Sequence, residues 1–156
     1  MTSRLSLAVA TALGAGYVPF APGTVGSVAG LVLFAGVRAT GQPAIEIAAI
    51  VVVFLLGAWA ATAAEQHFGH IDPGPVVIDE VLGMLVTLAL IPVSITGALA
   101  GFVLFRVFDV VKPPPCNRLE ALPGGWGVMS DDFMAAVYAH AGVRLLAWFW
   151  PEWMLA

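Results

Sequence analysis

The sequence predicts a single all-α domain, a bundle of helices integral to a membrane. Only 10% of the 156 residues are charged and 60% are hydrophobic, the mean hydropathy is +0.96, and long apolar runs are bounded by proline or glycine. A soluble domain carries about 25% charged residues. A chain with so few cannot cover its surface with polar groups, so much of that surface must face lipid. The length suits one domain over residues 1–156.

The first forty residues predict short, interrupted helices. Residues 1–12 hold one arginine and a short apolar run, which could be mistaken for a signal peptide, but a Gly/Pro-rich segment follows in place of a polar mature domain. The glycines and prolines of residues 14–27 forbid a continuous helix. A short helix is expected from Gly26 to Val37. The sequence leaves open whether the first two helices cross the bilayer.

The clearest span is expected from Pro43 to Ala64, because about 20 apolar residues cross a bilayer. An apolar stretch follows at Val76–Ile91, and two further spans are expected at Val93–Val111 and Asp131–Trp150. Three tryptophans near the end of the last segment are typical of a membrane interface.

The alternating directions of these helices predict that polar residues gather at one face. If residues 23–27 mark the near side, the helix that starts there leads away, the next returns, and the alternation continues through the last helix. No second polar set is expected across the membrane. The groups predicted at the near side are Glu65, His67, His70, Asp72, Asp79, Glu80, Arg106, Asp109, Lys112, Asp131 and Asp132.

Clustered carboxylates repel one another unless a cation gathers them. Magnesium prefers an all-oxygen site and keeps further positions for water and substrate phosphate. We therefore expect a Mg²⁺ site whose ligands also act in catalysis: Asp79, Glu80, Asp109, Asp131 and Asp132. His67 and His70 are three residues apart, a spacing that also suits a metal, but we interpret them as a surface pair.

Two features predict phosphate binding. Gly23, Thr24 and Ser27 belong to a glycine-rich turn that opens a helix, so free backbone N–H groups and two hydroxyls are expected to face outward. The alternative is that Thr24 is an N-cap. Arg106 and Lys112 flank Asp109 at spacings of three and can share a helix face with it. The alternative for this basic pair is snorkelling at the end of a span.

Four blocks of this chain resemble the phosphatidylglycerophosphatase A family. They are residues 16–19 with APGTVGS, DPGPVVIDEVLG, FRVFDVVKPPP and GGWGVMSDD, and they occur in the family order. The resemblance implies a central helix packed by its neighbours, a bacterial inner membrane location, and Mg²⁺-dependent hydrolysis of phosphatidylglycerol phosphate to phosphatidylglycerol and inorganic phosphate. The functional residues it carries over are Thr24, Asp79, Glu80, Arg106, Asp109, Lys112, Asp131 and Asp132. The chain departs from the family in its three successive prolines and at Glu120, where an aspartate is expected.

The expected chemistry is charge neutralisation at a phosphate. The carboxylates would hold Mg²⁺ against one phosphate oxygen, while Arg106, Lys112 and the Thr24 turn bind the others. Attack by an activated water and an aspartyl-phosphate intermediate both fit this arrangement.

Other classes fit less well. A net charge of −4 with no basic run excludes a nucleic-acid partner. Cys116 is the only cysteine, which rules out a disulfide framework and predicts a small core or interface residue. A transporter is the main rival, since intramembrane charges mark ion pathways, and Arg144 inside the last span is its best evidence. A structural membrane protein leaves the grouped acids unexplained, and a phospholipid synthase lacks its usual aspartates along one helix.

The balance of basic residues predicts that the near side is cytoplasmic. Lys112 and Arg118 lie close to a span end on that side, whereas the far turns hold only Arg38. An excess of Lys and Arg in short loops marks the cytoplasmic face. Together with the inner-membrane location that the resemblance implies, this predicts a multi-pass protein whose active site faces the cytoplasm.

Overall fold

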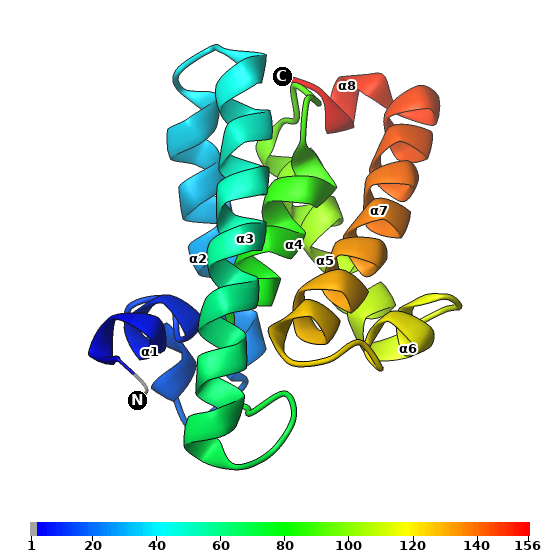
Figure 1. Cartoon of the computed structure of the whole chain (residues 1–156). Coiled ribbons are helices and arrows are strands. Elements are labelled where there is room, and N and C mark those ends of the chain that lie inside the picture. Colours follow the sequence, from blue (N-terminus) through cyan, green and yellow to red (C-terminus); the bar gives the residue numbers. More distant parts are fainter. Residues whose placement is uncertain (1–2) are drawn as a thin grey trace.

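The structure, a computed structural model, describes residues 3–156 and contains helices and no strand within that range. This confirms the all-α prediction. The helices are α1 (Arg4–Ala10), α2 (Pro22–Arg38), α3 (Pro43–Phe68), α4 (Ile78–Leu88), α5 (Ile95–Val111), α6 (Cys116–Leu119), α7 (Gly125–Phe149) and α8 (Pro151–Met154), with a 3₁₀ turn at Ala15–Tyr17. Helices α2, α3, α4, α5 and α7 form the bundle, and α1 lies beside its lower end in Figure 1.

Helix α4 is the centre of the bundle. Every residue in it except Glu80 is buried, and it packs against α2, α3, α5 and α7. Close approach depends on glycine at the contacts: a Cβ on Gly30 of α2 would overlap Met84, and one on Gly83 of α4 would overlap the Phe105 ring of α5. Small residues let helices approach closely in membrane proteins. The central position of α4 brings its first turn beside three other helices.

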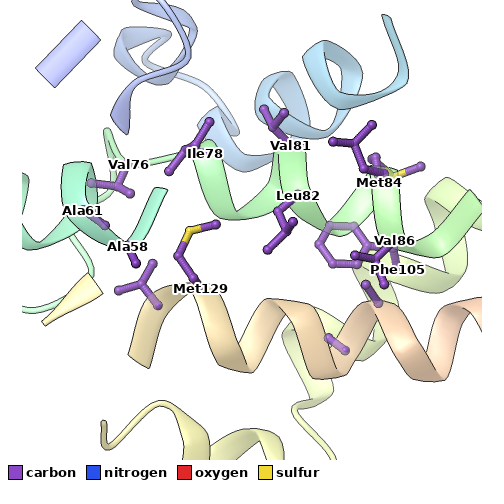
Figure 2. Packing of buried hydrophobic residues seen from close by; sticks show 14 of the residues in the cluster. Ala58, Ala61, Val76, Ile78, Val81, Leu82, Met84, Val86, Phe105 and Met129 are labelled. Atoms are coloured by element: carbon purple, nitrogen blue, oxygen red, sulfur yellow. The ribbon is translucent and has the colours of Figure 1, made fainter. Parts of the chain in front are cut away.

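The core follows α4 along its length. Figure 2 shows Leu82 on α4, Phe105 of α5 against the same helix, and the Met129 side chain of α7 directed toward Ile78 and Ala58. Leu82, Phe105 and Met129 are fully buried. Met129 also fills the space left by Gly57, where a Cβ would overlap its sulfur and methyl group. The α7 segment just before the acidic pair is therefore locked against α3 and α4.

Helix α3 is, within residues 3–156, the one helix long and apolar enough to cross a membrane. Its outer face exposes apolar side chains such as Val52, Leu55 and Trp59. The apolar stretch Val76–Ile91 forms a helix of only 11 residues, α4, which reaches about 16 Å, against about 30 Å of hydrocarbon. Its burial on all sides makes α4 a core helix enclosed by its neighbours.

Two helix starts also differ from the prediction. Helix α2 begins at Pro22, not at Gly26, because proline is well suited to the first helical position; the glycine-rich segment therefore forms its first turns. Helix α7 begins at Gly125, where the backbone N–H donates to Thr62 Oγ1 of α3 at 2.8 Å. The Asp131–Asp132 pair consequently lies in the second turn of α7 instead of at its start.

The alternating helix directions are as predicted. We call the lower end of the bundle in Figure 1 the site end: it holds the starts of α2, α4 and α7 and the ends of α3 and α5. The opposite, far end holds the α2–α3 turn, the α4–α5 loop and α8. The expectation that this far end lacks a polar set is wrong, because buried Glu46 accepts from Arg38 Nη1 at 2.7 Å and from the Leu90 backbone N–H at 2.8 Å.

Candidate active site

Three carboxylates meet at the site end. Asp79 and Glu80 lie in the first turn of α4, and Asp132 comes from the second turn of α7. Each can offer one oxygen such that all three oxygens lie within 4.8 Å of one another. Asp79 is 6% exposed and Asp132 is 4% exposed. We call these three residues the acidic triad.

The triad lacks partners for its buried oxygens. Asp79 Oδ1, Glu80 Oε2 and Asp132 Oδ2 are buried and make no hydrogen bond to any described residue. Buried polar atoms are nearly always hydrogen-bonded, and close buried carboxylates cannot all ionise without a compensating charge. An all-oxygen set with no His or Cys is the donor set preferred by a hard divalent cation such as Mg²⁺. The residues present therefore fit a metal ion of this kind.

Arg106 borders the triad from α5. Its Nη1 lies 2.8 Å from Asp109 Oδ2 and 3.4 Å from Glu80 Oε1. The guanidinium is held between a triad member and Asp109, and its side chain keeps 25% of its surface exposed. Its remaining N–H donors suit bidentate recognition of a phosphate.

The start of α2 closes the other side of the triad. A Cβ on Gly23 would overlap Glu80 Oε1 and would lie 2.9 Å from Arg106 Nη2, so the bare α2 backbone sits directly against both groups. A helix N-terminus carries partial positive charge. Pro22 has no N–H, and the Thr24 and Val25 N–H groups donate to Ala21 O at 3.0 and 3.3 Å, so Gly23 supplies the N–H available to an anion here. Thr24 is exposed next to it. Ser27 does not face outward as predicted, because it is fully buried and its hydroxyl donates to the Gly23 carbonyl at 2.9 Å.

Lys112 forms a second charged group beside the triad. Its Nζ lies 2.6 Å from Asp131 Oδ2 and 3.1 Å from Glu120 Oε1. Partial burial would lower the Lys112 pKa, but the two carboxylates outweigh it and raise that pKa above its ordinary value. Lys112 therefore stays protonated at neutral pH. Asp131 is engaged with this cation and Asp109 with Arg106, while the Asp109 side chain also lies against Asp132 of the triad.

The structure accounts for other residues singled out in the sequence. His67 and His70 are exposed, in line with their interpretation as a surface pair, and Cys116 is buried as predicted. Glu120 forms an ion pair with Lys112. Thr62 was missed: its hydroxyl donates to Ala58 O and accepts from the Gly125 N–H, which fixes the start of α7 on α3. A threonine within an apolar run offers no sequence signal for that contact.

The architecture is α-helical and membrane-associated, and its buried carboxylates lie beside an arginine and a helix N-terminus. These features define a class of membrane protein that can bind the phosphate group of a lipid. A model of the family described as phosphatidylglycerophosphatase A matches residues 8–147. The chain belongs to the phosphatidylglycerophosphatase A family. It is accordingly an enzyme of the phosphoric monoester hydrolase class.

Three relatives illustrate the family. The chain is 38% identical over 151 residues to phosphatidylglycerophosphatase A of Haemophilus influenzae, covering 94% of this chain and 89% of the relative. Identity to the Escherichia coli protein of the same name is 30%, with 95% and 87% covered. A Bacteroides thetaiotaomicron protein, provisionally named a phosphatidylinositol-3-phosphatase, is 35% identical, with 94% and 96% covered. No solved structure matches this chain significantly.

Proposed function

We propose that this enzyme hydrolyses phosphatidylglycerol phosphate to phosphatidylglycerol and inorganic phosphate, with Mg²⁺ held by Asp79, Glu80 and Asp132. The observation that carries the proposal is the set of three unpartnered, buried carboxylate oxygens next to a partly exposed arginine. Relatives named for this activity match nearly the whole chain. When bound, Mg²⁺ would supply positive charge to the phosphate oxygens as negative charge develops on them.

The protein's own residues provide the remaining phosphate contacts. Arg106 would bind two phosphate oxygens with the N–H groups that its carboxylate partners leave free, and the Gly23 N–H at the start of α2 would bind another. Lys112, protonated and fixed by Asp131 and Glu120, would attract the dianionic headgroup. Their ion pairs hold Arg106 and Lys112 in place before the substrate binds, and charged groups positioned in advance stabilise developing charge most effectively.

The bond changes are those of phosphomonoester hydrolysis. An oxygen nucleophile forms a bond to phosphorus as the bond from phosphorus to the glycerol oxygen breaks, and the leaving alkoxide takes up a proton. Direct attack by water, with a site carboxylate accepting its proton, and attack by an aspartate followed by hydrolysis of the aspartyl-phosphate are the two routes that fit the site.

The proposal also includes the placement of the helices relative to the bilayer. Helices α2, α3, α5 and α7 would lie in the bilayer, and the site end would face the cytoplasm. Their exposed apolar side chains, among them Val32, Leu55 and Val103, suit contact with acyl chains. The substrate's phosphate would then meet Arg106 at the interface while its acyl chains stay in the inner leaflet.

A second substrate deserves a direct comparison because one relative carries a phosphatidylinositol-3-phosphatase name. Both lipids present a phosphomonoester on a glycerophospholipid headgroup. The test is phosphate release by purified protein in detergent, with each lipid, with Mg²⁺ or EDTA. Faster, Mg²⁺-dependent turnover of phosphatidylglycerol phosphate supports the proposal. Faster turnover of the inositol lipid would contradict the proposed substrate, and full activity in EDTA would contradict the proposed metal requirement.

A further inference from the structure

Arg144 is a charged residue that the proposed reaction does not use. It lies on α7, 12 residues beyond Asp132 and thus about 18 Å along the helix from the triad. Its Nε donates to His140 Nε2 at 2.7 Å. Arginine can only donate, so His140 Nε2 is the acceptor, and Nδ1 carries the proton that is donated to Thr87 O at 3.2 Å. A neutral histidine, braced on the end of α4, therefore orients the guanidinium.

The charge of Arg144 is not compensated within residues 3–156. The other far-end arginine, Arg38, pairs with Glu46 at 2.7 Å, whereas Arg144 has no carboxylate of the described residues within 4.0 Å. An unpaired cation in a bilayer segment is costly unless it reaches a polar partner. The planar guanidinium matches a phosphate group through parallel N–H donors. The exposed side chain thus presents an oriented, unused anion-binding group.

A cavity of about 390 Å³ adjoins this guanidinium. It lies between α7, the α4–α5 loop and the C-terminal tail, and apart from Arg144 its wall is apolar, including Ile91, Ala147, Trp148 and Leu155. The tail is fixed to the loop, because the Ser94 N–H donates to Met154 O at 2.9 Å and the Ala156 N–H donates to Pro92 O at 2.7 Å. The cavity wall is thus built from segments held together by backbone hydrogen bonds.

We propose that this far-end cavity binds an anionic phospholipid, with its phosphodiester on Arg144 and its glycerol and upper acyl carbons against Ala147 and Trp148. The charge complementarity between an uncompensated arginine and a phosphate selects the headgroup, and the apolar wall selects an amphipathic ligand. Exposed Trp148, Trp150 and Trp153 mark the membrane interface at this depth. This second lipid site lies at the opposite end from the triad and does not depend on the proposed reaction.

Native mass spectrometry of the full-length protein in nonionic detergent tests the proposal. The probe is phosphatidylserine, an anionic phosphodiester that is neither substrate nor product of the proposed reaction, with phosphatidylcholine as its comparison. We expect one phosphatidylserine to bind more tightly than phosphatidylcholine. Arg144→Gln should weaken that binding roughly tenfold, the size of one lost charge-assisted contact. Ala147→Phe, which fills the cavity and keeps the charge, should weaken it as well.

The matched control is Arg118→Gln, which removes an exposed positive charge from α6 at the site end. It should leave phosphatidylserine binding unchanged, and unchanged phosphate release by Arg144→Gln would show that this variant folds. Equal losses in the Arg118 and Arg144 variants would indicate general charge attraction and overturn the site. Retained phosphatidylserine binding in Arg144→Gln or Ala147→Phe would also overturn the site. A third contradicting result is a wild-type dimer that Arg144→Gln dissociates without any change in bound lipid, because Arg144 would then serve a protein contact.

Discussion

The Lys112 ammonium lies 2.6 Å from Asp131 Oδ2, whereas the neighbouring Asp132 belongs to the acidic triad. Two adjacent aspartates of α7 thus have different roles: Asp131 holds the Lys112 ammonium, and Asp132 contributes to the proposed metal site. Because successive residues of a helix differ by about 100° in direction, such a division is a natural result of an Asp-Asp pair on one helix.

This division predicts different kinetic defects for the two aspartates. Asp132→Asn should weaken Mg²⁺ activation, because it removes an anionic triad oxygen. Asp131→Asn should leave the Mg²⁺ requirement unchanged and mainly raise KM, because it frees Lys112 from its position. Phosphate release measured against Mg²⁺ and against lipid concentration separates the two effects. The same shift in Mg²⁺ dependence for both variants would show that the aspartates share one role.

Gly23→Ala should abolish most activity with little loss of stability. The added methyl group would overlap Glu80 Oε1 and crowd Arg106, so the phosphate site would be displaced while the outer turns of α2 stay intact. Gly36→Ala on the same helix is the matched control, since its Cβ would meet no atom within 4 Å. That control should keep full activity and gain about 0.5–1 kcal/mol of stability from helix propensity. Equal activity in the two variants would argue against a phosphate site at Gly23.

Cys116→Ala should retain near wild-type phosphate release. Burial is the main cause that raises the pKa of the Cys116 thiol above its ordinary value, so the thiol stays protonated at neutral pH and is a poor nucleophile. Thiol-directed reagents should likewise react slowly with the folded protein. A large loss of turnover in a variant that expresses and extracts normally would contradict this expectation.

Single cysteines in a Cys116→Ala background test the proposed orientation. Asn117→Cys lies exposed on α6 at the site end, and Gln42→Cys lies exposed in the α2–α3 turn at the far end. An impermeant thiol reagent added to sealed cells should label Gln42→Cys and spare Asn117→Cys. The reverse labelling pattern would indicate the opposite orientation in the membrane, and labelling of both cysteines from outside would contradict the multi-pass placement.

Much of this arrangement follows from local sequence signals. Proline and glycine punctuate the helices, and the number of helices between acidic segments fixes which ends meet, so Asp79, Glu80 and Asp132 could be placed together from the sequence. The start of α7 could not, because it depends on the Gly125 N–H meeting Thr62 of α3, a contact 63 residues apart in the chain. Likewise, hydropathy alone does not distinguish α3, whose outer face is exposed, from α4, which is apolar because other helices surround it.

The pairing of the charged side chains also could not be predicted from the sequence. Spacing of three suggested that Arg106, Asp109 and Lys112 form one unit, but Lys112 follows the last residue of α5 and turns to α7. Glu46 shows the same limit at the far end: its burial and its bond to the Leu90 N–H depend on where α4 stops. Such pairings are set by helix ends, which sequence patterns locate to within only a few residues.

The most direct test of the acidic triad is phosphate release from phosphatidylglycerol phosphate as free Mg²⁺ is titrated, for the wild type and for Asp79→Asn, Glu80→Gln and Asp132→Asn. Removal of one catalytic charge interaction commonly costs about 3–4 kcal/mol of barrier, or roughly 10²- to 10³-fold in rate. We predict no turnover of the wild type in EDTA, recovery on adding Mg²⁺, and losses of that size in all three variants with unchanged detergent extraction and helix content. Wild-type rates in all three variants, or full activity in EDTA, would contradict the assignment of the triad as the metal site.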